Sequence, residues 1–197
     1  MPRLADFTSR FSHHFEPFGE AAPLRFRQYI EGLAAAKKKN MDRMEEAVPG
    51  ADEQQLQHFL TNVDWDHRVV MHQVASEVDA VLGGPDTGLI LDETAFPKKG
   101  KESVGVARQW CGTLGKVENC QVAVFGVLVH GERVGAVDTR LFLPQGWTDD
   151  PERCRKAGVP REDQTRKTKA DLALEIVTEA RERGLRFGWV GFDAFYS

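Results

Sequence analysis

The stretch "GLILDETAFPKKGKESVG", residues 88–105, joins an apolar run, a carboxylate and a cluster of positive charge. The run has the composition of a buried strand and ends at Asp92. Lys98, Lys99 and Lys101 follow in a segment whose proline and glycine are typical of a turn. The pattern predicts a strand that carries a carboxylate at its tip, next to a basic turn.

A second apolar run of the same kind, "LRFGWVGFDA" at 185–194, leads to another aspartate, Asp193. Two more strands are predicted between the two runs, "NCQVAVFGVLVHG" at 119–131 and "ERVGAVDTRLFLP" at 132–144. Because only a short turn around "HGE" separates these two strands, we expect them to form a hairpin.

A helix is predicted immediately before the last strand. Thr168 and Asp171 have the spacing of a capping box, an apolar face follows, and Gly184 ends the helix. The order of elements is therefore strand, strand, strand, helix, strand. The first three strands can form an antiparallel meander, and a right-handed crossover through the helix returns the fourth strand parallel to the first. This arrangement is the first half of a ribonuclease H-like fold, and it brings Asp92 and Asp193 close together.

The sequence before this sheet is helical. Apolar residues recur at helical spacing in "LRFRQYIEGLAAA", "ADEQQLQHFL" and "DWDHRVVMHQVASEVDAVL", the last with Asp64 as its expected N-cap. "GGPD" at 83–86 is the clearest break in the pattern. We therefore expect an α+β protein with two domains. A helical N-terminal region at 1–83, a candidate for DNA binding, precedes an incomplete ribonuclease H-like domain at 86–197.

Two polar connections are interpreted as loops. The first, at 104–120, carries Arg108, Gln109 and Lys116, and it is either a DNA contact near the site or a structured surface loop. The second, at 144–167, contains the densest run of basic residues. That run is either a phosphate-binding surface or a solvated loop whose charge is balanced by neighbouring acids.

The composition limits the class of protein. The chain has 197 residues, 41% of them apolar and 28% charged, as is ordinary for a globular protein. Its net charge of −4 excludes a global positive field that would attract nucleic acid or an anionic membrane, so such binding would need local patches. The three cysteines match no zinc-ligand spacing, and neither a signal peptide nor a membrane-spanning run is evident. We expect reduced thiols and a cytoplasmic location.

Two carboxylates at neighbouring strand ends repel each other unless a cation lies between them. Oxygen ligands alone select hard ions such as Mg²⁺ or Mn²⁺, and a pair of such ions can promote phosphodiester cleavage. The three lysines would then meet a nucleic-acid backbone. The simpler alternative is that each aspartate ends its strand because aspartate favours turns, and that the lysines are solvated.

From about residue 30 onward, the chain resembles the DDE-type transposases of bacterial insertion sequences. It is most similar to a branch with "FPKKGK" shortly after the first catalytic aspartate. The matching stretches are collinear and specific. They are "LQHFLTNVDWD" at 56–66, "DETAFPKKGKESVGVARQWCGTLGKVENCQ" at 92–121, "LFLPQGWTDDPERCRKAGVP" at 141–160, "TKADLALEIV" at 168–177 and "GFDAFY" at 191–196.

The resemblance implies a two-metal transposase that cleaves DNA and transfers strands at insertion-sequence ends. It makes Asp92 the first and Asp193 the second catalytic acid, both of them ligands of Mg²⁺ or Mn²⁺. Transposon-end DNA is the expected partner, and a homo-oligomer is a candidate assembly. The family also needs a third acid, usually a glutamate on a later helix, and the sequence ends at Ser197 without one. We therefore expect a truncated, inactive transposase or a fragment of one.

The DNA contacts expected near the site come from the basic turn and the first connection: Lys98, Lys99, Lys101, Arg108, Gln109 and Lys116. Two other functions remain open. The chain could be a non-catalytic DNA-binding remnant that regulates transposition, or an unrelated metal-dependent nuclease.

Overall fold

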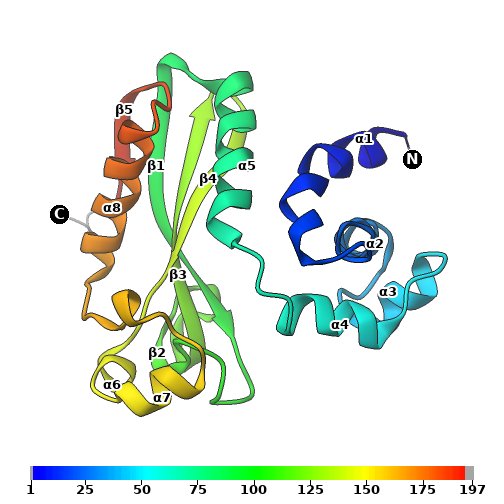
Figure 1. Cartoon of the computed structure of the whole chain (residues 1–197). Helices are drawn as coiled ribbons and strands as arrows, with labels where there is room; N and C mark the ends of the chain where they lie inside the picture. Colours follow the sequence, from blue (N-terminus) through cyan, green and yellow to red (C-terminus); the bar gives the residue numbers. More distant parts are fainter. Residues whose placement is uncertain (1, 194–197) are drawn as a thin grey trace. The chain divides into compact units, whose positions relative to one another are not determined.

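The computed structural model describes residues 2–193, and its contacts divide the chain into two compact units (Figure 1). The first unit ends at Gln73 and the second begins at Val74, so the division falls within helix α5 (His67–Leu82). Each unit is described by itself below. In the part of the chain that the structure describes, no helix is long and apolar enough to cross a membrane.

The first unit is helical. Asp52 caps one helix by accepting a hydrogen bond from the backbone N–H of Gln55 at 2.8 Å. The expected cap of α5 at Asp64 is wrong, because Asp66 accepts the bond from the N–H of Arg68 at 2.8 Å. The unit contains α1 (Pro2–Phe11), η1 (Ser12–His14), η2 (Glu16–Phe18), α2 (Ala22–Ala35), α3 (Met41–Ala47), α4 (Glu53–Thr61) and the start of α5.

An aromatic cluster forms the core of this unit. The rings of Phe15 and Phe26 stack with centroids 4.3 Å apart, and Phe59 stacks on Trp65 with centroids 6.1 Å apart. Phe15 and Phe59 are almost completely buried. A second small cluster of buried side chains joins the connection after α2 to α3 and α4: Ala36, Met44 and Leu56.

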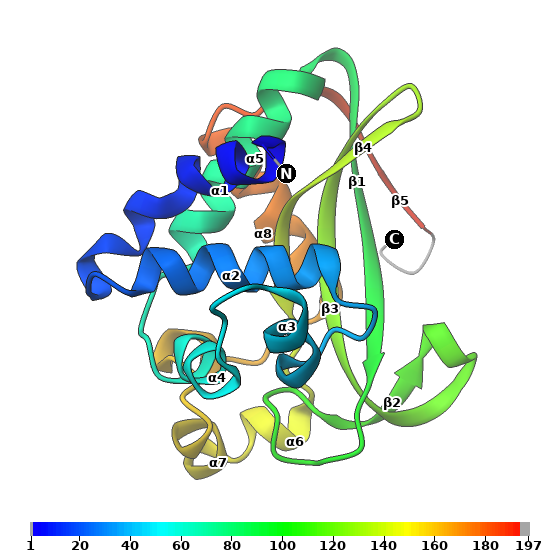
Figure 2. The same ribbon diagram turned by 90° about the vertical axis from the view of Figure 1, so that its right-hand side faces the viewer.

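The second unit is built on a five-stranded mixed sheet (Figure 2). The central strands β1 and β3 are antiparallel, β4 pairs with β3 antiparallel, and β5 pairs with β1 in parallel. The predicted meander, the crossover helix and the parallel last strand are confirmed, and the α+β fold is ribonuclease H-like. The strands are β1 (Gly84–Pro97), β2 (Ala107–Cys111), β3 (Lys116–His130), β4 (Arg133–Leu141) and β5 (Phe187–Phe192).

The structure corrects three strand assignments. The first strand does not end at Asp92, because β1 continues its pairing with β3 as far as Pro97. It also begins at Gly84, before the expected domain start at residue 86. The connection at 104–120 contains the additional strand β2, which pairs with the first residues of β3. The last strand was expected to reach Ala194, which lies outside the described residues.

Helix α8 (Lys169–Glu182) and the second half of α5 pack on one face of the sheet, here called the helix face. Gly126 of β3 allows the close approach of α8, since an added Cβ would lie 2.5 Å from the Cγ2 of Ile176. The predicted capping box is present, with the side chains of Thr168 and Asp171 each accepting from the other's backbone N–H. The helix ends at Glu182, and the predicted stop residue, Gly184, follows the C-cap residue Arg183 with a φ of 75°.

The segment 144–167 is not the simple loop that its polarity suggests. It forms α6 (Gln145–Thr148), α7 (Pro151–Lys156) and η4 (Arg161–Gln164). These turns enclose a small apolar core, although most residues of the segment are polar. Its buried side chains are Leu143, Trp147, Cys154 and Val159.

Candidate active site

The two aspartates belong to neighbouring parallel strands. Asp92 is the ninth residue of β1, and Asp193 directly follows β5. The last paired positions are Leu91 and Phe192, so the two aspartates occupy the next step of the same register. Adjacent strands lie about 4.8 Å apart. The proximity of the two carboxylates stays a prediction, which the parallel pairing of β1 and β5 supports.

Asp92 falls on the face of the sheet opposite α8, here called the open face. Side chains alternate along β1, so Leu89 and Leu91 are buried under the helices while Asp92 is exposed on the other side. Figure 2 shows α5 and α8 together on one side of the strands. The Oδ1 of Asp92 accepts a hydrogen bond from the backbone N–H of Glu93 at 2.7 Å. Asp92 can therefore remain in the middle of a strand because its own face is open to water.

The basic segment after β1 is held by its carbonyl groups. Asn119 of β3 donates from Nδ2 to the carbonyl oxygens of Lys98 at 2.7 Å and of Gly100 at 2.8 Å. Its own carbonyl accepts the N–H of Lys98 at 2.9 Å. These bonds use the backbone of the segment and leave Lys99 and Lys101 exposed.

The α6–α7 segment holds the rest of this connection. The indole N–H of Trp147 donates to the carbonyl of Val106 at 2.9 Å, and the guanidinium of Arg153 donates to the carbonyl of Lys101 at 2.9 Å. Arg153 also lies over the Trp147 ring, 3.8 Å from its centroid. On β3, Gln121 donates to the carbonyl of Val104 at 2.5 Å. The basic connection is therefore preorganised by side chains from two directions.

The sequence interpretation assigned no role to Asn119, Gln121 or Trp147, and it treated Arg153 only as part of the basic run at 144–167. Asn119 and Gln121 flank a cysteine in "NCQ", and Trp147 and Arg153 lie within the segment interpreted as a loop. The usable signal was a buried tryptophan in an otherwise polar segment, since an indole N–H needs a partner when it is buried.

The expected DNA contacts outside the lysine segment have different surroundings. Arg108 is exposed on β2. Gln109 donates from Nε2 to the carbonyl of Cys120 at 2.9 Å, so its amide is engaged in holding the hairpin. Lys116 forms an ion pair with Glu118 at 3.0 Å. The backbone N–H of Asn119, followed by the Lys116 ammonium, lowers the pKa of Glu118.

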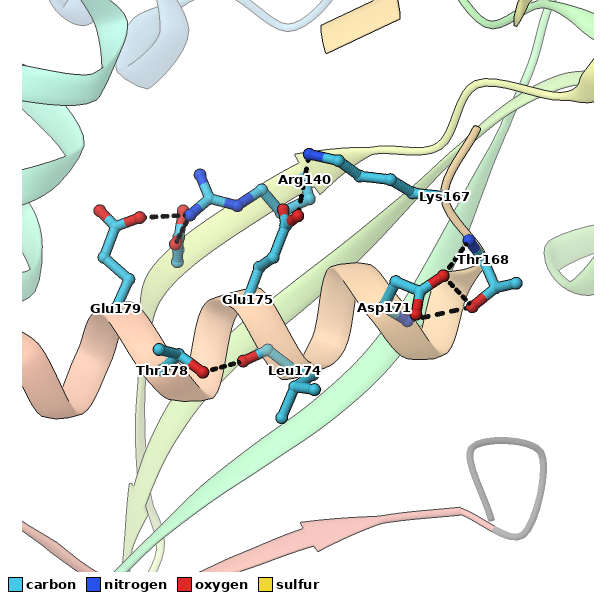
Figure 3. A network of polar contacts seen from close by, with 9 residues as sticks. Arg140, Lys167, Thr168, Asp171, Leu174, Glu175, Thr178 and Glu179 are labelled. Carbon is cyan, nitrogen blue, oxygen red and sulfur yellow. Dashed lines mark hydrogen bonds and ion pairs between the residues drawn. The ribbon is translucent and has the colours of Figure 1, made fainter. Parts of the chain in front are cut away.

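The acids of the helix face have partners within the protein. The neighbour of Asp92, Glu93, points under α8 and forms an ion pair with Lys169 at 2.6 Å. On β4, Arg140 lies 3.1 Å from the buried carboxylate of Asp138 and also pairs with Glu179 of α8 (Figure 3). These contacts fasten the helix to the sheet.

The described residues contain no cluster of three metal-ligand side chains. Across residues 2–193, no three His, Cys, Asp or Glu side chains are grouped so that they could hold an ion. The described cysteines are free and buried. Burial, followed by the neighbouring Cys111, raises the pKa of the Cys120 thiol to about 11, so that thiol stays protonated and a poor metal ligand.

The sheet topology defines the class of ribonuclease H-like proteins, with one aspartate within β1 and another directly after the parallel strand β5. The family model of the DDE superfamily endonucleases matches residues 15–197, and the chain belongs to this family. The chain is also similar to a protein of Microchaete diplosiphon described as a probable transposase for insertion sequence element IS701. The two are 32% identical over 168 residues, which cover 85% of this chain and 41% of that relative. The chain thus spans about two fifths of the length of the relative.

Proposed function

We propose that this chain contributes the first two acids of a transposase centre that cleaves DNA and transfers strands at insertion-sequence ends. The observation that carries the proposal is the parallel register of β1 and β5, which supports a shared role for Asp92 and Asp193. Family membership supports the same chemistry.

The donor set fits a hard divalent cation. Asp92 and Asp193 are both exposed and offer carboxylate oxygens from adjacent strands, and Mg²⁺ usually takes one or two carboxylates and keeps several waters. Bound at these oxygens, Mg²⁺ or Mn²⁺ would supply the Lewis-acid chemistry of phosphodiester cleavage. The role of the two side chains is to hold negative charge at a fixed place on a rigid sheet.

The basic segment supports a polyanionic substrate. Lys99 and Lys101 are exposed, and the carbonyl groups around them are held by Asn119 and Arg153. In this proposal Lys98, Lys99 and Lys101 neutralise phosphates on DNA that lies across the open face, with Arg108 further along it. Lys116, one residue before Val117, lies on the opposite face of β3. The contribution of these basic side chains to the affinity for DNA should fall steeply as salt rises, because phosphate contacts release counterions.

A non-catalytic DNA-binding role is the second candidate. Within residues 2–193, no His, Cys, Asp or Glu side chain joins the two aspartates as a third metal ligand. The 197-residue chain by itself should therefore bind metal weakly and cleave DNA slowly or not at all, since loss of one member of a catalytic set commonly removes most of the activity. The division into a helical domain at 1–83, with DNA contacts of its own, and a catalytic part at 86–197 belongs to the same proposal. So do a homo-oligomer on the DNA and a cytoplasmic location.

The test separates metal binding from cleavage. Mn²⁺ binding to the purified chain is measured by electron paramagnetic resonance for the wild type, Asp92→Asn, Asp193→Asn and the control Glu93→Gln. We expect weak binding that each aspartate variant loses and that the control keeps, because Glu93 points to the opposite face. Binding that survives in both aspartate variants would refute the shared site.

Cleavage is tested with labelled insertion-sequence-end DNA and Mn²⁺, with Asp92→Ala as the control. We expect no measurable product from the 197-residue chain. A product that Asp92→Ala abolishes would instead show that these residues suffice for catalysis and would exclude the non-catalytic alternative.

A further inference from the structure

The hairpin of β2, η3 (Gly112–Leu114) and the start of β3 carries an exposed aromatic side chain, Trp110, that has no role in the proposed function. Trp110 is 55% exposed, and its cross-strand partner Val117 is 51% exposed. Leu114, at the turn of the hairpin, is 46% exposed. Figure 2 shows the hairpin extending away from the rest of the sheet. Exposed apolar side chains that lie next to each other, as Trp110 and Val117 do, mark a candidate binding surface.

The surroundings of Trp110 are basic, although the chain is acidic overall. Residues 97–118 contain five basic and two acidic side chains, a local charge of +3 against −4 for the whole chain. Arg108 lies two residues from Trp110 and therefore on the same face of β2, and it is exposed. An aromatic platform beside cations matches a polyanion that also offers flat apolar surfaces, which is the chemistry of nucleic acid.

The face that carries Trp110 continues into the face that carries Asp92. Val117 pairs with Trp110, and Phe125, eight residues further along β3, pairs with Asp92. Even residue steps keep the side chains on one face, and eight residues of strand span roughly 26 Å. One DNA segment of about eight nucleotides, at about 3.4 Å each, is long enough to reach from the aspartates to the hairpin.

We propose that Trp110 is a base-stacking platform that binds unpaired nucleotides of the DNA, an inference that rests on the proposed DNA-binding function. The bases of a continuous duplex cover each other's faces, so an indole on a strand can stack only on a base that is unpaired or displaced. The specified ligand is therefore a single-stranded DNA segment that flanks the cleavage site. Arg108 and the lysine segment hold its phosphates.

The experiment compares four fluorescent oligonucleotides in low salt with EDTA, so that metal binding plays no part. They are a 12-nucleotide single strand, the same strand with abasic sites in place of all bases, a blunt 12-base-pair duplex and that duplex with a three-nucleotide overhang. The proteins are the full 197-residue chain, Trp110→Ala, Trp110→Phe and Phe192→Ala. Phe192 is a matched control, since it is also 55% exposed but lies on the opposite face of the sheet, in register with the buried Leu91.

We expect Trp110→Ala to weaken binding of the single strand and the overhang about tenfold, since stacking on one base is worth on the order of a tenfold to hundredfold change in affinity. Binding of the abasic strand and of the blunt duplex should change less than about twofold. Trp110→Phe should retain most of the affinity but lose the tryptophan quenching that accompanies single-strand binding. Phe192→Ala should behave as the wild type, and thermal unfolding checks that each variant is folded.

Two results would overturn the stacking proposal. In one, Trp110→Ala binds every oligonucleotide as the wild type does, or changes only the oligomeric state, so that Trp110 serves a protein contact. In the other, it weakens the abasic strand as much as the intact one. If the wild-type chain binds no oligonucleotide at all, the proposed DNA-binding function fails as well. Equal binding of intact and abasic strands defeats the stacking step alone.

Discussion

The helix face and the open face of the sheet hold their acidic side chains in different ways. Under α8, Glu93 pairs with Lys169, and Arg140 lies between Asp138 and Glu179. On the open face, Asp92 is exposed and accepts a backbone hydrogen bond. The helix face therefore uses its charges to fasten one element to another. The open face instead presents charge to solvent, as a site for a cation and a polyanion requires.

The same two faces differ in their apolar side chains. Leu89, Leu91 and Ile176 form a buried core between sheet and helix, whereas Phe96 and Trp110 on the open face are 43% and 55% exposed. The packing that stabilises this unit therefore lies on the helix face of the sheet. Substitutions on the other side should change function with little cost to folding.

The largest effect should come from the core of the helix face. Ile176→Ala removes a fully buried side chain and should lower the free energy of unfolding by about 2–5 kcal/mol. Phe96→Ala on the open face should cost about 1 kcal/mol or less. Urea unfolding followed by circular dichroism measures both. Equal losses would show that the open face is packed as tightly as the helix face.

The next effect concerns the charges under α8. Arg140→Ala removes the cation from beside the buried Asp138 carboxylate and should cost about 3 kcal/mol, because a buried carboxylate that loses its paired cation is strongly destabilising. The control is Arg155→Ala, which breaks an exposed pair with Glu152 on α7 and should leave the unfolding midpoint unchanged. If Arg140→Ala left the free energy of unfolding unchanged, these charges would not fasten α8 to the sheet.

A smaller effect is expected at the start of α8. Thr168→Ala removes the N-cap hydroxyl and should cost about 1 kcal/mol. The hydrogen bond from the backbone N–H of Thr168 lowers the pKa of the Asp171 carboxyl. The stabilisation that the ionised Asp171 carboxylate gives is therefore present above the ordinary pKa of an aspartate, and it is lost as the pH falls through the lowered pKa.

Acid titration of the unfolding midpoint checks the sign of this effect. The wild type should lose more stability on acidification than Asp171→Asn, in which the titrating group is absent. The same acid slope in both proteins would contradict the role of the capping box.

The smallest effect on stability should be at Asp92. In metal-free buffer Asp92→Asn should change the free energy of unfolding by about 0.5 kcal/mol or less, because the side chain is exposed. With Mn²⁺ present, the midpoint of the wild type should rise and that of Asp92→Asn should not, since only a bound cation stabilises the folded state. Glu93→Gln should show the reverse pattern, with a lower midpoint and an unchanged response to Mn²⁺.

Local patterns in the sequence were sufficient for the main elements. Apolar runs rich in valine, isoleucine and leucine identified the long strands, and the spacing of Thr168, Asp171 and Gly184 identified the limits of α8, because caps act within one helical turn. The chain order of the elements and the handedness of crossovers were sufficient to predict that β5 returns parallel to β1. Asp92 and Asp193 became one candidate site on that basis.

Only the tertiary structure decided what depends on long-range pairing. Strand β1 extends past Asp92 to Pro97 because the length of β3 supplies partners, and no local pattern states how long a partner will be. Strand β2 was hidden for a different reason: its burial alternates, but its residue types do not follow that alternation, since the aromatic Trp110 is exposed and the polar Gln109 is engaged. The anchoring of the lysine segment by Asn119 joins groups about 20 positions apart in the chain. Such contacts arise from packing of distant segments, which the local order of residues does not encode.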